Sequence, residues 1–147
     1  MQDFEVEDDE HGGTVVRIDG YPQSYVSLDD RIDFANTRGC DLFISIHCNA
    51  MPTHNTVSGT ETYYYTPQSL GLAQALHPTV VGVVRERDGG IRRRGFAVIR
   101  RTTMPSVLVE VAYIDHLGDE EKLTNPLFQR QVGEAIRAGA VRYFETQ

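Results

Sequence analysis

The sequence predicts one α/β domain, in which a mostly parallel, twisted sheet carries helices on both faces. Three observations support this fold class. The chain has 147 residues, of which 40% are hydrophobic, enough for a single core. Short β-branched segments alternate with segments whose apolar residues recur at helical spacing. Residues 106–113 are almost continuously apolar, as strands covered on both faces tend to be. We expect residues 1–13 to be a flexible acidic segment and residues 14–147 to form the domain.

The first half of the domain is predicted to run strand, helix, strand. Residues 14–18 (TVVRI) are β-branched and favour a strand. A helix should begin after Ser27, which has Asp30 three residues later as in a capping box, and end at Gly39. Residues 41–47 favour a buried strand, residues 48–60 a loop, and residues 62–65 a further strand.

The second half is predicted to alternate in the same way. Thr66 and Pro67 favour a helix start, and Pro78 should kink or restart that helix. Residues 96–100 and 106–113 are predicted strands. Asn125 and Pro126 open a last helix that reaches about Tyr143.

Charge is unevenly distributed along the chain. The net charge is −7, and the first ten residues contribute −6 of it. Residues 85–101 hold seven arginines against two acidic residues, a local charge of +5. A basic segment on an acidic protein favours an anionic ligand over nucleic acid, although a solvated surface loop is an equal alternative. No apolar run approaches the length of a membrane span, and no signal peptide opens the numbered chain.

Two residues stand out as candidates for chemistry. Glu110 interrupts the apolar strand 106–113, and a buried carboxylate must either be paired or shift its pKa upward. A salt bridge to a nearby arginine and a role as general acid and base are both open at this point. His47 ends strand 41–47, so it should meet Glu110 beyond the carboxyl ends of the strands, unless it is a structural histidine. His54, His77 and His116 are expected to be exposed rather than ligands.

Four segments then point to a family. They are SLDDR (27–31), DLFISIHCNA (41–50), GTETYYY (59–65) and MPSVLVEV (104–111). In this order they resemble the catalytic domain of zinc-dependent N-acetylmuramoyl-L-alanine amidases of type 3, which are cell-wall hydrolases. The resemblance covers nearly the whole chain, from about Val15 to Phe144.

The resemblance implies a fold, a reaction and roles for particular residues. Such enzymes hydrolyse the amide between the lactyl group of N-acetylmuramic acid and the first L-alanine of the stem peptide. Zinc is the implied cofactor, His47 matches a zinc ligand and Glu110 matches the catalytic glutamate. The resemblance gives Glu61 either a structural role or a role in contact with the residues that bind the metal. Asn49 either orients the crevice or simply forms a turn.

The family's first histidine ligand and its glutamate ligand have no clear match. Residues 10–13 (EHGG) lead directly into strand 14–18, which corresponds to the family's second strand. We therefore expect the first strand, the first helix and two zinc ligands to be missing. Three interpretations stay open: a shortened amidase, an inactive relative that binds peptidoglycan or regulates, or a rearranged site that uses Glu10 and His11.

The resemblance also predicts the partner and the location of the protein. Peptidoglycan is the expected partner, and the location is periplasmic or extracellular, at the cell wall. Missing elements would leave an exposed sheet edge, which favours self-association.

Overall fold

A computed structural model of the chain describes residues 4–8, 14–18 and 27–147, the first two ranges as backbone strands. The strands are β1 (Phe4–Asp8), β2 (Thr14–Ile18), β3 (Phe43–Asn49), β4 (Thr60–Tyr64), β5 (Asp88–Arg93) and β6 (Ser106–Tyr113). The helices are α1 (Leu28–Arg38), α2 (Leu70–Val84), α3 (Ala97–Arg100), α4 (Leu117–Leu123) and α5 (Pro126–Glu145), and a 3-10 turn, η1, spans Pro67–Ser69.

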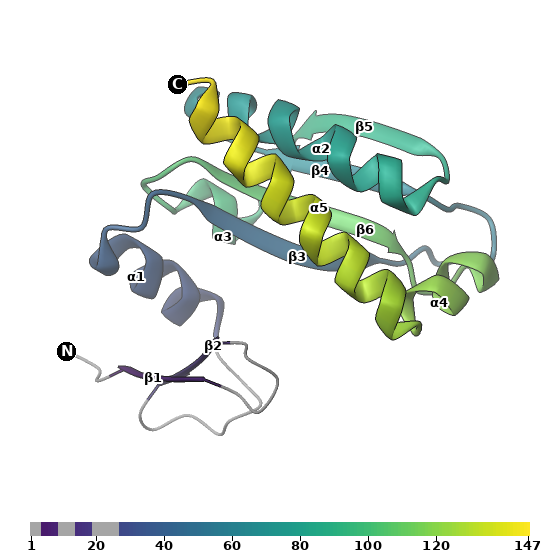
Figure 1. Cartoon of the computed structure of the whole chain (residues 1–147), viewed down its shortest axis with the longest axis horizontal. Coiled ribbons are helices and arrows are strands. Elements are labelled where there is room, and N and C mark those ends of the chain that lie inside the picture. The colour runs from purple at the N-terminus through teal and green to yellow at the C-terminus, as the bar shows by residue number, and fades with distance from the viewer. Residues whose placement is uncertain (1–3, 9–13, 19–26) are drawn as a thin grey trace.

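The main sheet has four strands in the order β3-β6-β4-β5 (Figure 1). β3 pairs with β6 and β4 pairs with β5 in parallel, whereas β4 and β6 are antiparallel. β1 and β2 form a separate antiparallel hairpin. The predicted α/β class with a mostly parallel sheet is therefore confirmed. Residues 4–8 are a strand, while the expected flexibility of residues 1–13 stays a prediction.

The two faces of the sheet are covered by different helices. On one face, α2 and α5 lie side by side in front of the strands in Figure 1 and share the larger apolar core with Val107, Val109 and Val111 of β6. On the other face, Leu108 packs with residues of α1 and α3 in a smaller cluster. Alternate residues of β6 thus enter opposite cores, as the pleat of a strand requires.

Helix α1 has the ends that its sequence predicts. The Ser27 hydroxyl accepts a hydrogen bond from the Asp30 amide at 3.1 Å. Gly39 closes the helix in the left-handed conformation, with φ of 64°, and its amide bonds the Ala35 carbonyl. These local signals position the helix directly before strand β3.

The expected restart of the helix at Pro78 was wrong, because α2 is a single helix from Leu70 to Val84 that includes this proline. The alternative expectation, a kink at Pro78, stays a prediction. Pro78 is exposed, so it costs the helix one hydrogen bond on the solvent side. Leu72, Leu76 and Val80 are fully buried beneath it. Packing of this apolar face outweighs the local cost of the proline.

The segment between α2 and β6 also differs from expectation. Residues 88–93, expected as a basic loop, form edge strand β5, and residues 96–100, expected as a strand, contain helix α3. Exposed arginines suit an edge strand, which has one unpaired side. The short apolar run 96–100 cannot distinguish strand from helix by periodicity alone.

Among residues 4–8, 14–18 and 27–147, no helix combines the length and apolar character needed to cross a membrane. The helix α4, which sequence patterns did not predict, follows β6 and leads into α5.

Candidate functional site

Three ionisable residues form a row across the sheet. His47 of β3 is the register partner of Glu110 of β6, and Glu110 is in turn the register partner of Glu61 of β4. Paired residues on neighbouring strands point to the same face and lie about 5 Å apart, so the row extends over about 10 Å. Glu110 therefore stands between an imidazole and a second carboxylate.

Glu61 is held by a dense set of donors. Its side chain is 6% exposed, and its Oε1 accepts a hydrogen bond from Arg87 Nη2 at 3.2 Å. Arg92 Nη2 lies 3.5 Å from the same oxygen, and the Tyr63 hydroxyl donates to Oε2. Burial raises the pKa of Glu61, but the hydrogen bonds from Tyr63 and Arg87 and the charges of both arginines outweigh it and lower the pKa below its usual range. Glu61 is thus an ionised, fully partnered carboxylate.

Glu110 has the opposite environment. Its Oε2 is buried and has no hydrogen-bond partner among the residues that the structure describes. Burial, and then the negative charge of Glu61, raise the pKa of Glu110. The salt bridge that the sequence left open goes to Glu61 instead, because Arg87 and Arg92 lie on the β5 side of the sheet. A half-buried carboxyl with an unsatisfied oxygen and a raised pKa is suited to proton transfer.

His47 offers a neutral nitrogen to this row. Burial and the nearby charge of Arg31 lower the pKa of His47, which favours the uncharged imidazole at neutral pH. Neutral imidazole is the form that binds a metal or accepts a proton. Cys48 follows on the strand, and burial together with the charge of Glu110 raises the pKa of its thiol, which disfavours thiolate chemistry.

The described residues do not complete a metal centre. A catalytic zinc ion takes three protein ligands and a water molecule. His47 supplies one donor and Glu110 an unpartnered oxygen, whereas the oxygens of Glu61 are already bonded to Arg87 and Tyr63. Within the ranges 4–8, 14–18 and 27–147, no three His, Cys, Asp or Glu residues are grouped to hold a metal. Glu10 and His11 lie outside the described residues.

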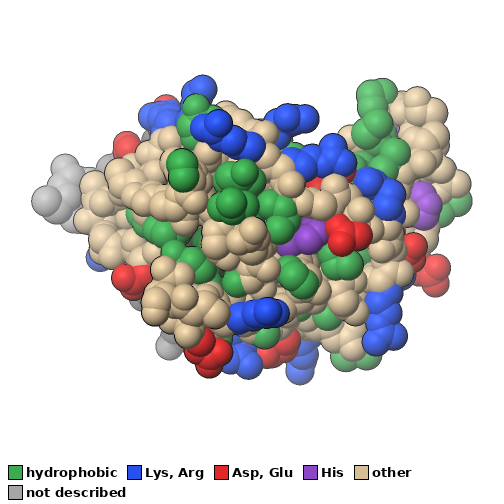
Figure 2. Space-filling model, turned by 90° about the horizontal axis from the view of Figure 1, so that it is seen from above, with side chains coloured by type: hydrophobic (Ala, Val, Ile, Leu, Met, Phe, Trp, Pro, Cys, Tyr) green, Lys and Arg blue, Asp and Glu red, His purple; other side chains and the backbone are tan. Residues whose placement is uncertain are grey.

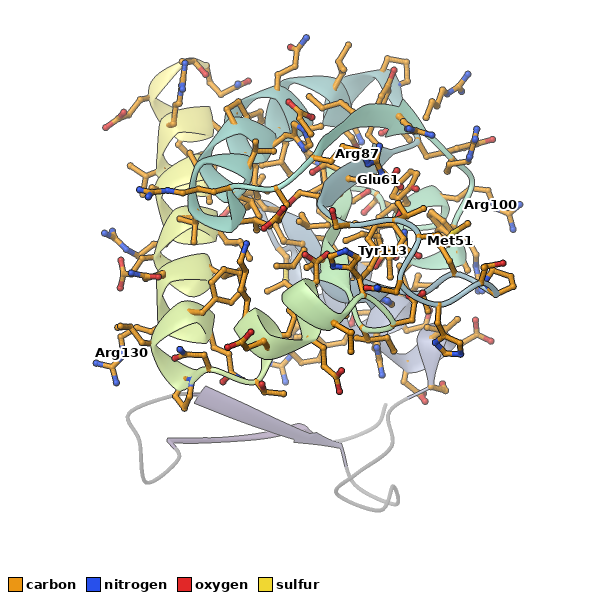
Figure 3. All side chains as sticks on the ribbon, turned by 90° about the vertical axis from the view of Figure 1, so that its right-hand side faces the viewer. Met51, Glu61, Arg87, Arg100, Tyr113 and Arg130 are labelled. Carbon is orange, nitrogen blue, oxygen red and sulfur yellow. The ribbon has the colours of Figure 1, made fainter. Side chains whose placement is uncertain are left out.

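A pocket opens beside the row. It has a volume of about 650 Å³ and is lined by Asn49, Met51, Thr56, Val57, Ser58, Glu61, Tyr63, Arg87, Arg92 and Tyr113. Figure 3 shows Glu61, Arg87, Tyr113 and Met51 gathered at one end of the sheet, while Arg130 projects from α5 on another side. Asn49, which the sequence associates with either the crevice or a turn, is the last residue of β3 and lines the pocket, and its Oδ1 accepts the Ala50 amide at 2.9 Å.

Asp119 fixes the strand ends that frame this pocket. It is fully buried at the start of α4, and its Oδ2 accepts the amides of Gly59 at 3.0 Å and Tyr113 at 2.9 Å. One carboxylate therefore ties the beginning of β4 to the end of β6. Unpaired amides at these buried ends would be costly, so Asp119 has a structural explanation.

Two expectations of exposure were wrong, because His116 is only partly exposed and His77 is buried. Its ring nitrogens contact the Thr62 hydroxyl at 2.9 Å and Asp88 Oδ1 at 2.8 Å, which link α2 to β4 and β5. His116 acts at a helix end, where its Nδ1 accepts the Asp119 amide at 3.3 Å. Both have structural partners away from the row. His54 is exposed, as expected.

The basic segment does not make a continuous cationic surface. Figure 2, which looks onto the β5 side of the molecule, shows Lys and Arg side chains separated by apolar and acidic ones. Arg87 and Arg92 turn to Glu61, and Arg93 donates to the Tyr65 carbonyl at 2.8 Å.

Sequence reasoning identified His47, Glu110 and Glu61 but missed the partners of Glu61. Arg87 and Arg92 are 26 and 31 positions away, and only the parallel pairing of β4 with β5 brings them close. One local signal was available, since Glu61 and Tyr63 are two apart on a strand and must share a face.

Comparison with known proteins gives consistent results. A family model described as N-acetylmuramoyl-L-alanine amidase matches residues 9–142. The N-acetylmuramoyl-L-alanine amidase LytC of Bacillus subtilis is 36% identical over 125 residues, which cover 82% of this chain and 25% of LytC. The probable cell wall amidase LytH of Staphylococcus epidermidis is 34% identical over 134 residues, which cover 91% of this chain and 44% of LytH. The chain thus spans between a quarter and a half of these relatives.

Solved structures show the same likeness. The catalytic domain of the amidase CwlV from Bacillus (Paenibacillus) polymyxa var. colistinus superposes with a TM-score of 0.79 at 34% identity, covering 84% of this chain and 68% of that one. An N-acetylmuramoyl-L-alanine amidase from Clostridium difficile 630 gives a TM-score of 0.79 at 36% identity with the same coverage.

Proposed function

This chain belongs to the N-acetylmuramoyl-L-alanine amidase family, and on that premise we propose that it hydrolyses the amide between the lactyl group of N-acetylmuramic acid and L-alanine. The observation that carries the proposal is the row in which Glu110 lies between His47 and Glu61 with one buried, unpartnered oxygen.

The reaction assigns Glu110 to proton transfer. Glu110 accepts a proton from the attacking water as the oxygen bonds to the carbonyl carbon. It then returns a proton to the alanine nitrogen as the carbon–nitrogen bond breaks, leaving a lactyl carboxylate and a free amine. A raised pKa suits both halves of this cycle, because the group must gain and lose a proton near neutral pH.

Glu61 acts on this reaction from the next strand. Its negative charge, held in place by Arg87 and Tyr63, opposes ionisation of Glu110. We therefore assign Glu61 a positioning role and Asn49 a place in the wall of the pocket.

We further propose zinc as the cofactor, with His47 as one ligand. Support comes from family membership and from the neutral state that its lowered pKa favours. The described residues lack a full set of metal donors.

We place the activity at the cell wall, outside the cytoplasm. Support comes from relatives named as cell wall amidases. Self-association through a free strand edge also stays a proposal. Its support is that β3 is an edge strand of the main sheet and that Ile46 on it is 58% exposed.

The test is cleavage of a muramoyl-L-alanyl peptide, followed by chromatography of the released peptide, with zinc added. Glu110→Gln should lower the rate at least about 100-fold, since general acid–base groups contribute that much. Glu121→Gln, an exposed glutamate of α4, is the matched control and should leave the rate unchanged.

Two results would overturn the proposal. One is full activity in Glu110→Gln. The other is binding of peptidoglycan fragments by the unmodified chain and by Glu110→Gln with no cleavage by either, which would favour a peptidoglycan-binding or regulatory module.

A further inference from the structure

The pocket beside the row contains two arginines that Glu61 does not saturate. Arg87 uses Nη2 for Glu61 and Nε for the Ser58 carbonyl at 3.1 Å. Arg92 uses Nη2 for Glu61 and Nε for the Gly89 carbonyl at 3.1 Å. Arg87 also hydrogen-bonds the side chain of Tyr113, another residue of the pocket wall. The Nη1 group of Arg92 has no partner among the described residues. The two arginine side chains are 44% and 45% exposed where they line the pocket.

Their positions are fixed rather than adaptable. Each arginine is held by a backbone carbonyl on one side and by the buried Glu61 carboxylate on the other. Gly89 makes this arrangement possible, because a Cβ there would lie 2.3 Å from Glu61 Cγ. A preorganised guanidinium loses little side-chain entropy when an anion binds.

The charge of the pocket matches one carboxylate. Arg87 and Arg92 contribute two positive charges and the ionised Glu61 one negative charge, leaving an excess of +1. Arginine N–H groups bind carboxylates through charge-assisted hydrogen bonds, and the free edge of Arg92 together with the remaining N–H groups of Arg87 supplies donors for both oxygens. A doubly charged phosphate would be matched less well.

The pocket also adjoins the proposed reaction centre. Glu61 is both a wall of the pocket and the register partner of Glu110. Asn49 lies two residues after His47 on β3 and lines the pocket too. A chemical group bound in the pocket can therefore belong to the same substrate molecule as an amide placed over Glu110.

We infer that this pocket binds a side-chain carboxylate of the peptide attached to the scissile amide, with Arg87 and Arg92 as the specificity-determining residues. The inference rests on the proposed function for its choice of ligand. The carboxyl group of the muramic acid is consumed in the scissile amide, so the free carboxylates of such a substrate are on the peptide side. An acidic peptide is then preferred over its carboxamide counterpart.

The experiment measures binding without cleavage. N-acetyl-L-alanyl-glutamic acid and N-acetyl-L-alanyl-glutamine, both as C-terminal amides, differ only in one carboxylate and are titrated into the full chain by calorimetry. We expect the acid to bind at least about tenfold more tightly. Arg87→Gln and Arg92→Gln should each abolish that preference, whereas Arg94→Gln should keep it. Arg94 lies on the same segment and is exposed outside the pocket, so it is a matched control for net charge.

Several outcomes overturn the inference. They are equal affinity for the two peptides, a preference that survives both pocket variants, an equal loss in Arg94→Gln, and tighter binding of glycerol phosphate than of the acidic peptide. Arg92→Gln gives an independent result if Arg87→Gln fails to fold, as judged by circular dichroism. If the chain binds the acidic peptide selectively but cleaves nothing, the proposed function fails and this inference stands. If it cleaves acidic and amidated substrates with equal KM, the inference fails alone.

Discussion

Glu61 and Glu110 lie directly opposite each other on antiparallel strands, yet only Glu61 has ion-pair partners among the described residues. Two arginines from the β5 side neutralise one carboxylate and leave the other beside an imidazole. The same pair of residue types therefore has opposite pKa shifts, lowered for Glu61 and raised for Glu110. Such divergence supports the proposed role of Glu110 in proton transfer and that of Glu61 as a fixed charge.

Glu110→Gln should become more stable relative to the parent protein as pH rises. The pKa of Glu110 in the folded protein is above its ordinary value of 4.5. Between these two pKa values Glu110 is more protonated in the folded than in the unfolded state, so the parent protein loses stability as pH rises across this range. Glutamine has no such loss. The Tm of Glu110→Gln minus the Tm of the parent should be larger at pH 7 than at pH 4. Thermal unfolding of both proteins at these two pH values measures it, and a smaller value at pH 7 would contradict the prediction.

Glu61→Gln should show the opposite dependence. The folded pKa of Glu61 is below 4.5, so its carboxylate stabilises the protein above that value, and the contribution is lost as pH falls through the folded pKa. We expect the variant to be about 1–3 kcal/mol less stable at pH 7, because ionised hydrogen bonds are removed. Urea unfolding between pH 3 and pH 7 measures the difference, which should narrow toward pH 3. Glu121→Gln is the control for both carboxylates.

Gly89→Ala should destabilise the protein and disturb Glu61. The new Cβ would lie 2.8 Å from the Thr60 carbonyl as well as against the Glu61 side chain, and the backbone atom cannot move aside cheaply. A cost of about 1–3 kcal/mol is typical of such overpacking. Gly82→Ala on α2 meets nothing within 4 Å and should instead stabilise by about 0.5–1 kcal/mol. Chemical denaturation of both variants measures their unfolding free energies. An unchanged unfolding free energy in Gly89→Ala would contradict the close approach of Gly89 to Thr60 and Glu61.

Asp119→Ala should cost about 2–4 kcal/mol of unfolding free energy. The change leaves the buried amides of Gly59 and Tyr113 without their acceptor. Glu121→Ala, on the exposed side of the same helix, should change stability by less than about 0.5 kcal/mol. Amide hydrogen exchange at Gly59 and Tyr113 should accelerate only in Asp119→Ala. Unchanged protection there would show that other groups hold these strand ends.

Zinc binding should depend on His47. Removal of a nitrogen ligand from a metal site weakens affinity strongly, so His47→Ala should bind zinc at least about tenfold more weakly in a competition titration with a chelator. His54→Ala, an exposed histidine of the loop after β3, is the control. Equal affinity in the parent and His47→Ala would remove His47 from the ligand set. His11→Ala in the same assay tests the interpretation that Glu10 and His11 complete the site.

The sequence by itself determined the α/β class, the apolar strand around Glu110 and the capped ends of α1 and α5. It also determined the order of motifs that identifies the family. These features depend on neighbouring residues, because caps, turns and apolar periodicity act over a few positions. The same locality explains the errors at Pro78 and in residues 88–100, because the packing of α2 and α3 and the pairing of β5 with β4 depend on distant elements.

Only the tertiary structure decided how the charges are shared. Strand register places Glu110 between His47 and Glu61, and the pairing of β4 with β5 gives Arg87 and Arg92 to Glu61 rather than to Glu110. Register is fixed by which face of each strand enters the core, a property of all strands together. The pKa of Glu110 follows from that arrangement, since desolvation and the charge of Glu61 exist only once the sheet has formed.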